Sequence, residues 1–145
     1  MPAYAIDAFV EDLKAITAEH TDEREVLRRV TPLAARLAED TGWVQPGYYG
    51  GSEEQGFGVT ILYEGADSEI LVETVCWLPG RGVTPHDHKT WGVVVGLDGV
   101  ETNTNWRRKD DGAKPGYADL EERNDVTLKR GQTCTFMPDD IHSVR

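Results

Sequence analysis

The sequence predicts a mainly β domain, either an all-β barrel or a double-sheet jelly roll, preceded by a helical segment. From Gly47 onward, frequent glycines separate short runs of β-branched and aromatic residues, a pattern typical of many short strands joined by tight turns. Before that point, apolar residues recur at the spacing of an amphipathic helix. The 145 residues make one domain, in which a helical segment, 1–42, packs on a barrel, 43–145.

The helical segment contains two apolar stripes. The first is formed by Ile6, Phe9, Val10, Leu13 and Ile16. A second helix is expected to begin at Asp22, a favoured N-cap residue that is followed three positions later by Glu25, as in a capping box. Thr31 and Pro32 resemble a fresh N-cap and first-turn pair, which would divide this stretch into two short helices. Gly42 is the expected stop signal.

Six strand-like runs follow in the barrel segment. They cover residues 57–63, 68–77, 90–97, 100–106, 126–128 and 133–137. Residues 109–116 have the composition of a loop, and residues 129–132 that of a tight turn. A jelly roll needs about eight strands. We therefore expect an open barrel, completed either by chain beyond Arg145 or by a strand from a second copy in a homodimer.

The composition narrows the class of function. Fifteen Lys and Arg against 26 Asp and Glu give a net charge of −11, which argues against nucleic acid and anionic membranes as partners. No apolar run approaches the roughly 20 residues of a membrane helix, and the first residues do not resemble a signal peptide. Two cysteines cannot make a disulfide framework. We expect a cytoplasmic protein.

Three of the four histidines predict a metal site. His86 and His88 are two residues apart, so in an extended chain their side chains project to the same face. Two adjacent imidazoles are a common metal clamp. His142 follows the last strand-like run, after a predicted turn that leads into a further strand, which is expected to have barely begun at the end of the sequence. The fourth, His20, lies in the helical segment and is assigned no role.

The spacing around these histidines resembles the two cupin motifs. The first motif, G-x5-H-x-H-x3/4-E-x6-G, is matched from Gly80 to Gly99, with Gly92 in place of the glutamate. The second, G-x5-P-x-G-x2-H, is matched more loosely by Gly131, Pro138 and His142, with Asp140 in place of the glycine. Without the glutamate, three neutral ligands leave the metal its full positive charge, which favours an anionic ligand such as a thiolate. Gly92 also leaves room beside the metal.

In these motifs and the residues around them, the chain resembles the cysteine dioxygenase family, the thiol dioxygenase branch of the cupins. The clearest stretch runs from Cys76 to Asn105, and the resemblance extends over residues 47–145. The form His-Asp-His-x-x-Trp-Gly at residues 86–92 is similar to bacterial members, including the 3-mercaptopropionate dioxygenase type, more than to animal cysteine dioxygenases.

The resemblance implies a non-haem iron enzyme with a cupin fold. His86, His88 and His142 would hold one Fe(II), to which a small thiol binds through sulfur beside O2. Both oxygen atoms would go to sulfur and give a sulfinic acid. A substrate of the 3-mercaptopropionate or cysteine type is implied. The pocket would be lined by Gly92, Trp77, Trp91 and Thr60.

Two family features are replaced in this sequence. The cysteine that crosslinks to a tyrosine in animal enzymes falls at Val93, so we predict no crosslink; Cys76 and Cys134 are predicted to be small buried strand residues. An ungapped comparison places Thr60 or a neighbour at the arginine that clamps the substrate carboxylate. A clamp would then require Arg81, Arg107, Arg108 or a residue outside this chain.

Two other hypotheses for the function stay open. The three histidines also suit Zn²⁺ that activates water for hydrolysis or hydration, in another cupin enzyme. Alternatively, the chain is a non-catalytic cupin that binds a small molecule. Thiol-dependent O2 uptake separates the dioxygenase from both.

Overall fold

The computed structural model describes residues 4–66 and 69–145, and within them the structure is mainly β with two α-helices. In chain order the elements are α1 (Ile6–Glu19), α2 (Glu23–Leu37), η1 (Pro46–Tyr49), β1 (Phe57–Glu64), β2 (Leu71–Trp77), β3 (Val83–His86), β4 (Gly92–Val95), β5 (Glu101–Arg108), β6 (Leu120–Leu128), β7 (Thr133–Phe136) and β8 (Ile141–Val144). This confirms the mainly β class and the preceding helices.

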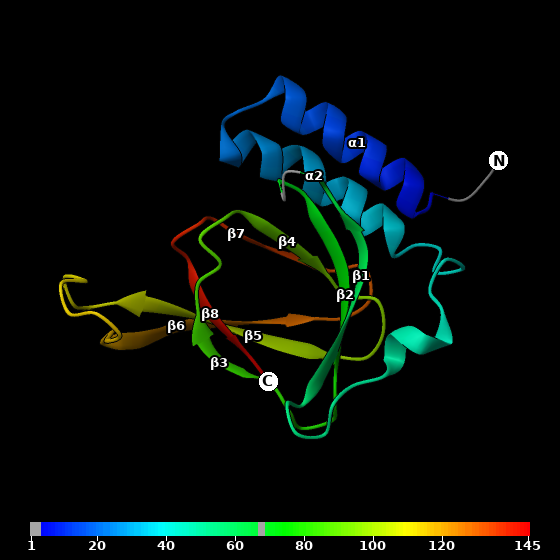
Figure 1. Ribbon diagram of the computed structural model, residues 1–145. Coiled ribbons are helices and arrows are strands. Elements are labelled where there is room, and N and C mark those ends of the chain that lie inside the picture. The colour runs from blue at the N-terminus through cyan, green and yellow to red at the C-terminus, as the bar shows by residue number, and fades with distance from the viewer. Residues whose placement is uncertain (1–3, 67–68) are drawn as a thin grey trace.

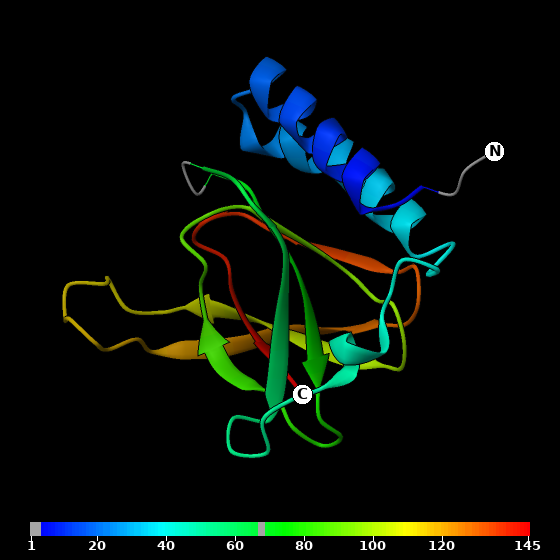
Figure 2. The ribbon, with the colours of Figure 1, turned by 45° about the vertical axis from the view of Figure 1, so that its right-hand side comes forward.

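The strands form three antiparallel sheets, in the orders β1-β2, β3-β8-β5-β6 and β4-β7. Among the described residues these sheets do not join into one continuously hydrogen-bonded barrel. Both helices lie on one side of the strands, with α2 next to β4 and β7, and the β5–β6 hairpin extends away from the rest (Figures 1 and 2). In the described part of the chain, no helix has the length and apolar character that crossing a membrane requires.

The start of α2 follows the predicted N-cap. The Asp22 carboxylate accepts a hydrogen bond of 3.0 Å from the Arg24 N–H, which satisfies one of the free donors of the first turn. Glu25 does not complete a capping box. Its carboxylate instead accepts from Arg28 at 2.6 Å and Arg29 at 2.8 Å, on the helix surface.

The expectation that Pro32 divides this stretch is wrong, because α2 runs without interruption from Glu23 to Leu37. Its buried face continues on both sides of the proline, with Val30 at 1% and Ala34 at 4% exposure. Thr31 does not act as an N-cap, since its hydroxyl donates back to the Leu27 carbonyl at 2.6 Å. The packing of the continuous apolar stripe therefore outweighs the hydrogen bond that Pro32 cannot make.

The helix pair and the strands share one apolar core. Buried residues of both helices, including Leu13, Val30 and Leu37, contact Trp91, Val93 and Val95 around β4. Arg130, in the turn before β7, donates to the carbonyl oxygens of the residues that end α2, Ala38 at 2.8 Å and Glu39 at 3.1 Å. These bonds satisfy carbonyls that a helix leaves free at its C-terminus and fix α2 against the sheet.

The strand predictions are confirmed for β1, β4, β5 and β7, apart from differences at the ends. The predicted run 68–77 contains β2, and its first residue, Ser68, lies outside the described residues. β6 begins at Leu120, six residues before the predicted 126. Its first half is charged and exposed, so it lacked the apolar pattern of a strand.

The strand β3 was missed, and β8 was expected only as a strand that has barely begun; each is four residues long. The count of six strands is therefore too low, since eight are present in the described chain. The expectation that the final strand has barely begun is also wrong, because β8 pairs with β3 on one side and with β5 on the other. β8 is thus an interior strand of the four-stranded sheet, and it carries His142.

Candidate metal centre

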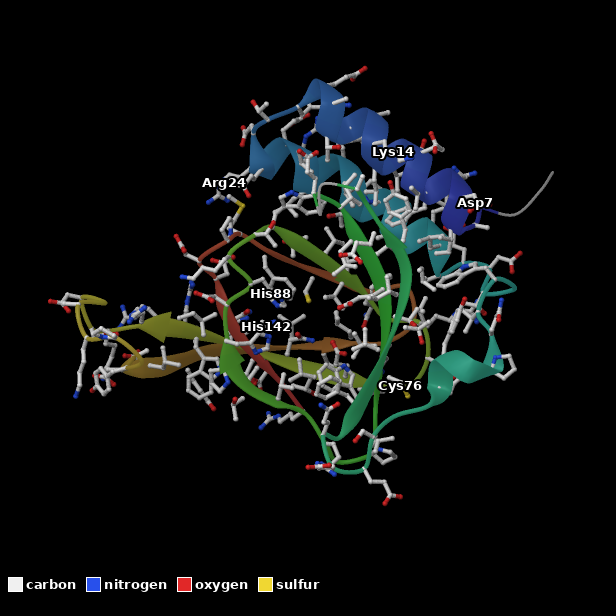
Figure 3. All side chains as sticks on the ribbon, in the orientation of Figure 1. Asp7, Lys14, Arg24, Cys76, His88 and His142 are labelled. Atoms are coloured by element: carbon white, nitrogen blue, oxygen red, sulfur yellow. The ribbon has the colours of Figure 1, made fainter. Side chains whose placement is uncertain are left out.

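The three predicted histidines lie together in the structure. His86 is the last residue of β3, His88 follows two residues later, and His142 is the second residue of β8. The register of β3 and β8 places His86 directly opposite His142. One nitrogen of each ring lies within 4.8 Å of the others. Figure 3 shows His88 and His142 side by side within the strand framework.

The rings approach one another closely. The centroid of the His86 ring lies 4.9 Å from that of His88 and 4.5 Å from that of His142. The Nε2 atoms of His88 and His142 are 2.9 Å apart. His86 presents its own Nε2 in the neutral state, because its Nδ1 lies 2.8 Å from the Thr84 carbonyl oxygen, which only accepts.

Two turns hold these histidines in place. Lys89 has a positive φ of 57°, and its N–H donates to the Pro138 carbonyl at 3.1 Å, so the loop after His88 is fastened to the turn before β8. In that turn the Asp140 carboxylate accepts from the Met137 N–H at 2.8 Å. This hydrogen bond stabilises the turn, which explains how Asp140 can occupy the position where the second cupin motif has a glycine.

Burial differs across the three histidines and shifts their pKa values. His142 is buried, with 4% exposure, His86 is half-buried and His88 is exposed. Burial, followed by the neighbouring His86 and His88, lowers the pKa of His142 to about 4. Burial and His86 also lower the pKa of His88. Neutral imidazole is the form that binds metal ions, so the site favours the metal-binding state.

Phe136 packs against this cluster. Its ring centroid lies 5.4 Å from that of His88 and 4.1 Å from that of His142, and it is 3% exposed. Gly92 stands opposite Phe136 in the register of β4 and β7. A Cβ added at Gly92 would lie 3.1 Å from Phe136 Cδ2. The aromatic ring therefore lies in the space next to Gly92, where the first cupin motif carries its glutamate.

The other predicted pocket residues take different positions. The Trp77 indole donates to Glu101, and its ring packs on Phe57 at 5.4 Å. Trp91 packs against the helical core. Thr60 is opposite Thr74 in the β1–β2 register, one residue out of phase with Phe57 and Trp77. In the described chain no hydrogen bond joins Thr60 to the histidines. The role of these residues in a pocket stays a prediction.

The arginines considered as carboxylate clamps have partners elsewhere in the described structure. Arg81 donates to the backbone carbonyls of Glu53 and Glu54, at 2.7 and 3.1 Å. Arg107 pairs with Glu121 at 3.0 Å, and Arg108 with Asp110 at 2.8 Å.

Neither cysteine is fully buried. Cys76 lies 3.1 Å from the Tyr49 carbonyl oxygen, away from the labelled histidines (Figure 3). Cys134 is half-buried on β7, where desolvation raises the pKa of its thiol to about 12. Val93, at the position of the family's crosslinking cysteine, packs towards the helices.

Four residues that support the histidines were not predicted from the sequence: Thr84, Glu101, Asn103 and Phe136. Phe136 had a signal, since it lies opposite Gly92 once the two strands are paired. Thr84 contacts His86 and Glu101 contacts Asn103 within a single strand each, whereas the contact of Asn103 with His142 depends on the pairing of β5 with β8.

No protein-family model matches this chain. The structure supports a group of three histidines, His86, His88 and His142, that can hold a metal ion. Three neutral nitrogen ligands on one side of an ion would leave its remaining positions for other ligands.

Proposed function

We propose that this chain is a thiol dioxygenase of the cysteine dioxygenase family, with a cupin-type fold and one Fe(II) held by His86, His88 and His142. The substrate would be a small thiol of the 3-mercaptopropionate or cysteine type. The observation that carries the proposal is the convergence of these three histidines, from two strands far apart in the sequence, without a carboxylate among them.

The ligand atoms are close enough to bind one ion. Two nitrogens that each bind a metal at about 2.1 Å lie about 3.0–3.4 Å apart. The Nε2 atoms of His88 and His142 are 2.9 Å apart, and one nitrogen of His86 lies within 4.8 Å of both. Three ligands on one side of an ion, with the other positions open, also form the arrangement of non-haem iron oxygenases.

The residues of this chain supply position, charge and exclusion of water. Because His86, His88 and His142 would bind as neutral ligands, an ion held by them would keep its positive charge, which would favour binding of a thiolate over a neutral thiol. Phe136 covers the rings of His88 and His142 on one side, so water is excluded there. Bound in this site, Fe(II) would supply the affinity for O2 and for sulfur.

The reaction balances without another reductant. One thiol and one O2 give one sulfinic acid: the O–O bond breaks, two S–O bonds form, sulfur loses four electrons and O2 gains four. The substrate proton remains on the product or passes to water, so no other cofactor is required.

The decisive experiment measures bound metal in the anaerobically purified protein, and then O2 uptake with 3-mercaptopropionate, cysteine and cysteamine. We expect about one iron per chain and a sulfinic acid product found by mass spectrometry. His86→Ala should lose both the iron and the O2 uptake. His20→Ala, which changes a histidine outside the cluster, should keep both.

Zinc in place of iron, or bound iron without O2 uptake for any thiol, would overturn the dioxygenase proposal. In the zinc case, hydrolytic activity restored by added Zn²⁺ would indicate the hydrolase or hydratase interpretation of the same three histidines.

A further inference from the structure

A chain of hydrogen bonds leads from Trp77 to the most buried histidine. The Trp77 Nε1–H donates to one oxygen of the Glu101 carboxylate. The other oxygen accepts from the Asn103 amide Nδ2 at 2.7 Å. The Oδ1 atom of Asn103 lies 3.0 Å from His142 Nδ1. Asn103 is 1% exposed and His142 is 4% exposed, so water does not compete for these bonds.

The direction of every bond in this chain is fixed by chemistry. The indole N–H only donates, and an ionised carboxylate only accepts. Glu101 must therefore receive the NH2 group of Asn103, which turns the amide oxygen towards His142. An amide oxygen only accepts, so Nδ1 of neutral His142 must carry the proton. Nε2 is left with a free lone pair, and it faces His88 Nε2 at 2.9 Å.

We infer that Asn103 is the positioning residue of the metal centre and that Glu101, through Asn103, selects the His142 tautomer that binds metal. This inference rests on the three-histidine metal site proposed above and names residues that act on it. The carboxylate is absent from the ligand position at Gly92. Instead, the carboxylate of Glu101, nine residues further along the sequence, acts on the ligand His142 through the amide of Asn103 without contacting the metal.

The strand pairing explains why these residues meet. Glu101 and Asn103 are two positions apart on β5, so their side chains share one face of the sheet. β5 pairs with β8 in a register that places Asn103 opposite Val144 and Asn105 opposite His142. Asn105 is thus the residue directly opposite His142, but it is not part of these hydrogen bonds, which makes it a matched control.

Glu101→Gln should reverse the direction of the hydrogen bonds between position 101, Asn103 and His142. The amide introduced at position 101 accepts from the indole through its oxygen and offers an NH2 group to Asn103. Asn103 must then turn its own oxygen towards position 101 and its NH2 group towards His142. That arrangement requires an unprotonated Nδ1, which moves the proton to Nε2 and blocks metal binding.

The double variant Glu101→Gln with Asn103→Asp should restore the original direction. The amide at position 101 donates to the new carboxylate at position 103, and that carboxylate accepts from His142 Nδ1–H. Asn103→Asp alone should bind metal poorly, because it places two carboxylates side by side in a buried site. A merely structural role for these residues predicts that the double variant is at least as damaged as either single one.

The experiment measures Fe(II) and Co²⁺ affinity and, on the metal-free protein at pH 7.5, the ¹⁵N chemical shifts that report which His142 nitrogen carries the proton. We expect Asn103→Leu and each of the two other single variants to bind metal about 10–100-fold more weakly. The double variant should recover most of the loss, and Asn105→Leu should change affinity less than about threefold. Glu101→Gln should move the His142 proton to Nε2.

Two results would overturn the inference: an unchanged metal affinity in Asn103→Leu, or an unchanged tautomer in Glu101→Gln. Neither readout requires thiol oxidation. If the unaltered protein binds metal but oxidises no thiol, the proposed activity fails while the inference about Asn103 is still decided by affinity. If it binds neither Fe(II) nor Co²⁺, both the proposed metal site and the inference about Asn103 fail.

Discussion

At the scale of single residues, the metal centre depends on what lies behind the ligands as much as on the ligands themselves. Phe136 packs on the imidazoles of His88 and His142, and Asn103 forms a hydrogen bond with His142 from the neighbouring strand β5. Gly92 makes this arrangement possible through size alone, because its backbone does not have a positive φ. Its lack of a side chain leaves space for the Phe136 ring.

Gly92→Ala should therefore destabilise the protein, and Gly92→Glu should do so more strongly. An added Cβ lies 3.1 Å from Phe136, closer than the roughly 3.5–4.0 Å of a favourable carbon–carbon contact. We expect a loss of about 1–3 kcal/mol in the free energy of unfolding, measured by urea denaturation. Gly47→Ala is the control, since a Cβ there meets nothing within 4 Å. Equal stability of Gly92→Ala and the unaltered protein would contradict this account.

At the scale of elements, α2 shows that tertiary packing overrides a local signal. Pro32 leaves the Arg28 carbonyl without its usual partner inside the helix, yet the apolar face from Val26 to Leu37 is buried along its whole length. The helix is held at both ends, by Asp22 at the start and by Arg130 and Trp43 at the finish.

Pro32→Ala should raise the stability of the protein, because it restores one hydrogen bond and Pro32 is exposed, so no core contact is lost. Proline in a helix interior costs about 3 kcal/mol relative to alanine, and the greater freedom of the unfolded alanine chain reduces the gain. We expect an increase of about 1–3 kcal/mol in the free energy of unfolding. An unchanged or lower melting temperature would show that the fold requires a proline at this position.

The elements differ in how far the sequence could predict them. His86, His88 and His142 could be found because their spacing and the glycines around them form a pattern along the chain. Asn103 could not, because its partner His142 is 39 residues away and the contact depends on β8 lying between β3 and β5. β3 was missed because its residues, Val83–His86, include Pro85 and give no apolar run or alternation, whereas the equally short β4 and β7 lie within predicted strand-like runs.

At the scale of the whole molecule, the metal-free protein should lose stability as pH falls below neutrality. His142 has a pKa of about 4 in the folded chain, below its ordinary value near 6.5. Between these values the unfolded chain binds a proton that the folded chain does not. The stability is therefore full above about pH 6.5 and decreases as pH falls towards 4.

Melting temperatures of the metal-free protein between pH 7.5 and 5 measure this effect. In His142→Gln the decrease over that range should be smaller than in the unaltered protein. An identical pH dependence in His142→Gln would show that this histidine is not kept neutral by the fold.

The graded exposure of the three histidines sets an order for exchange of a bound ion. His86 and His142 are on paired strands, whereas His88 is exposed on a loop fastened to the rest of the chain by the Lys89–Pro138 hydrogen bond. Release of His88 opens the site without disturbing the sheet, while release of His142 requires β8 to leave its two neighbours. Ions should therefore enter and leave past His88, and the rate at which a chelator removes metal should follow the mobility of that loop and not the unfolding of the protein.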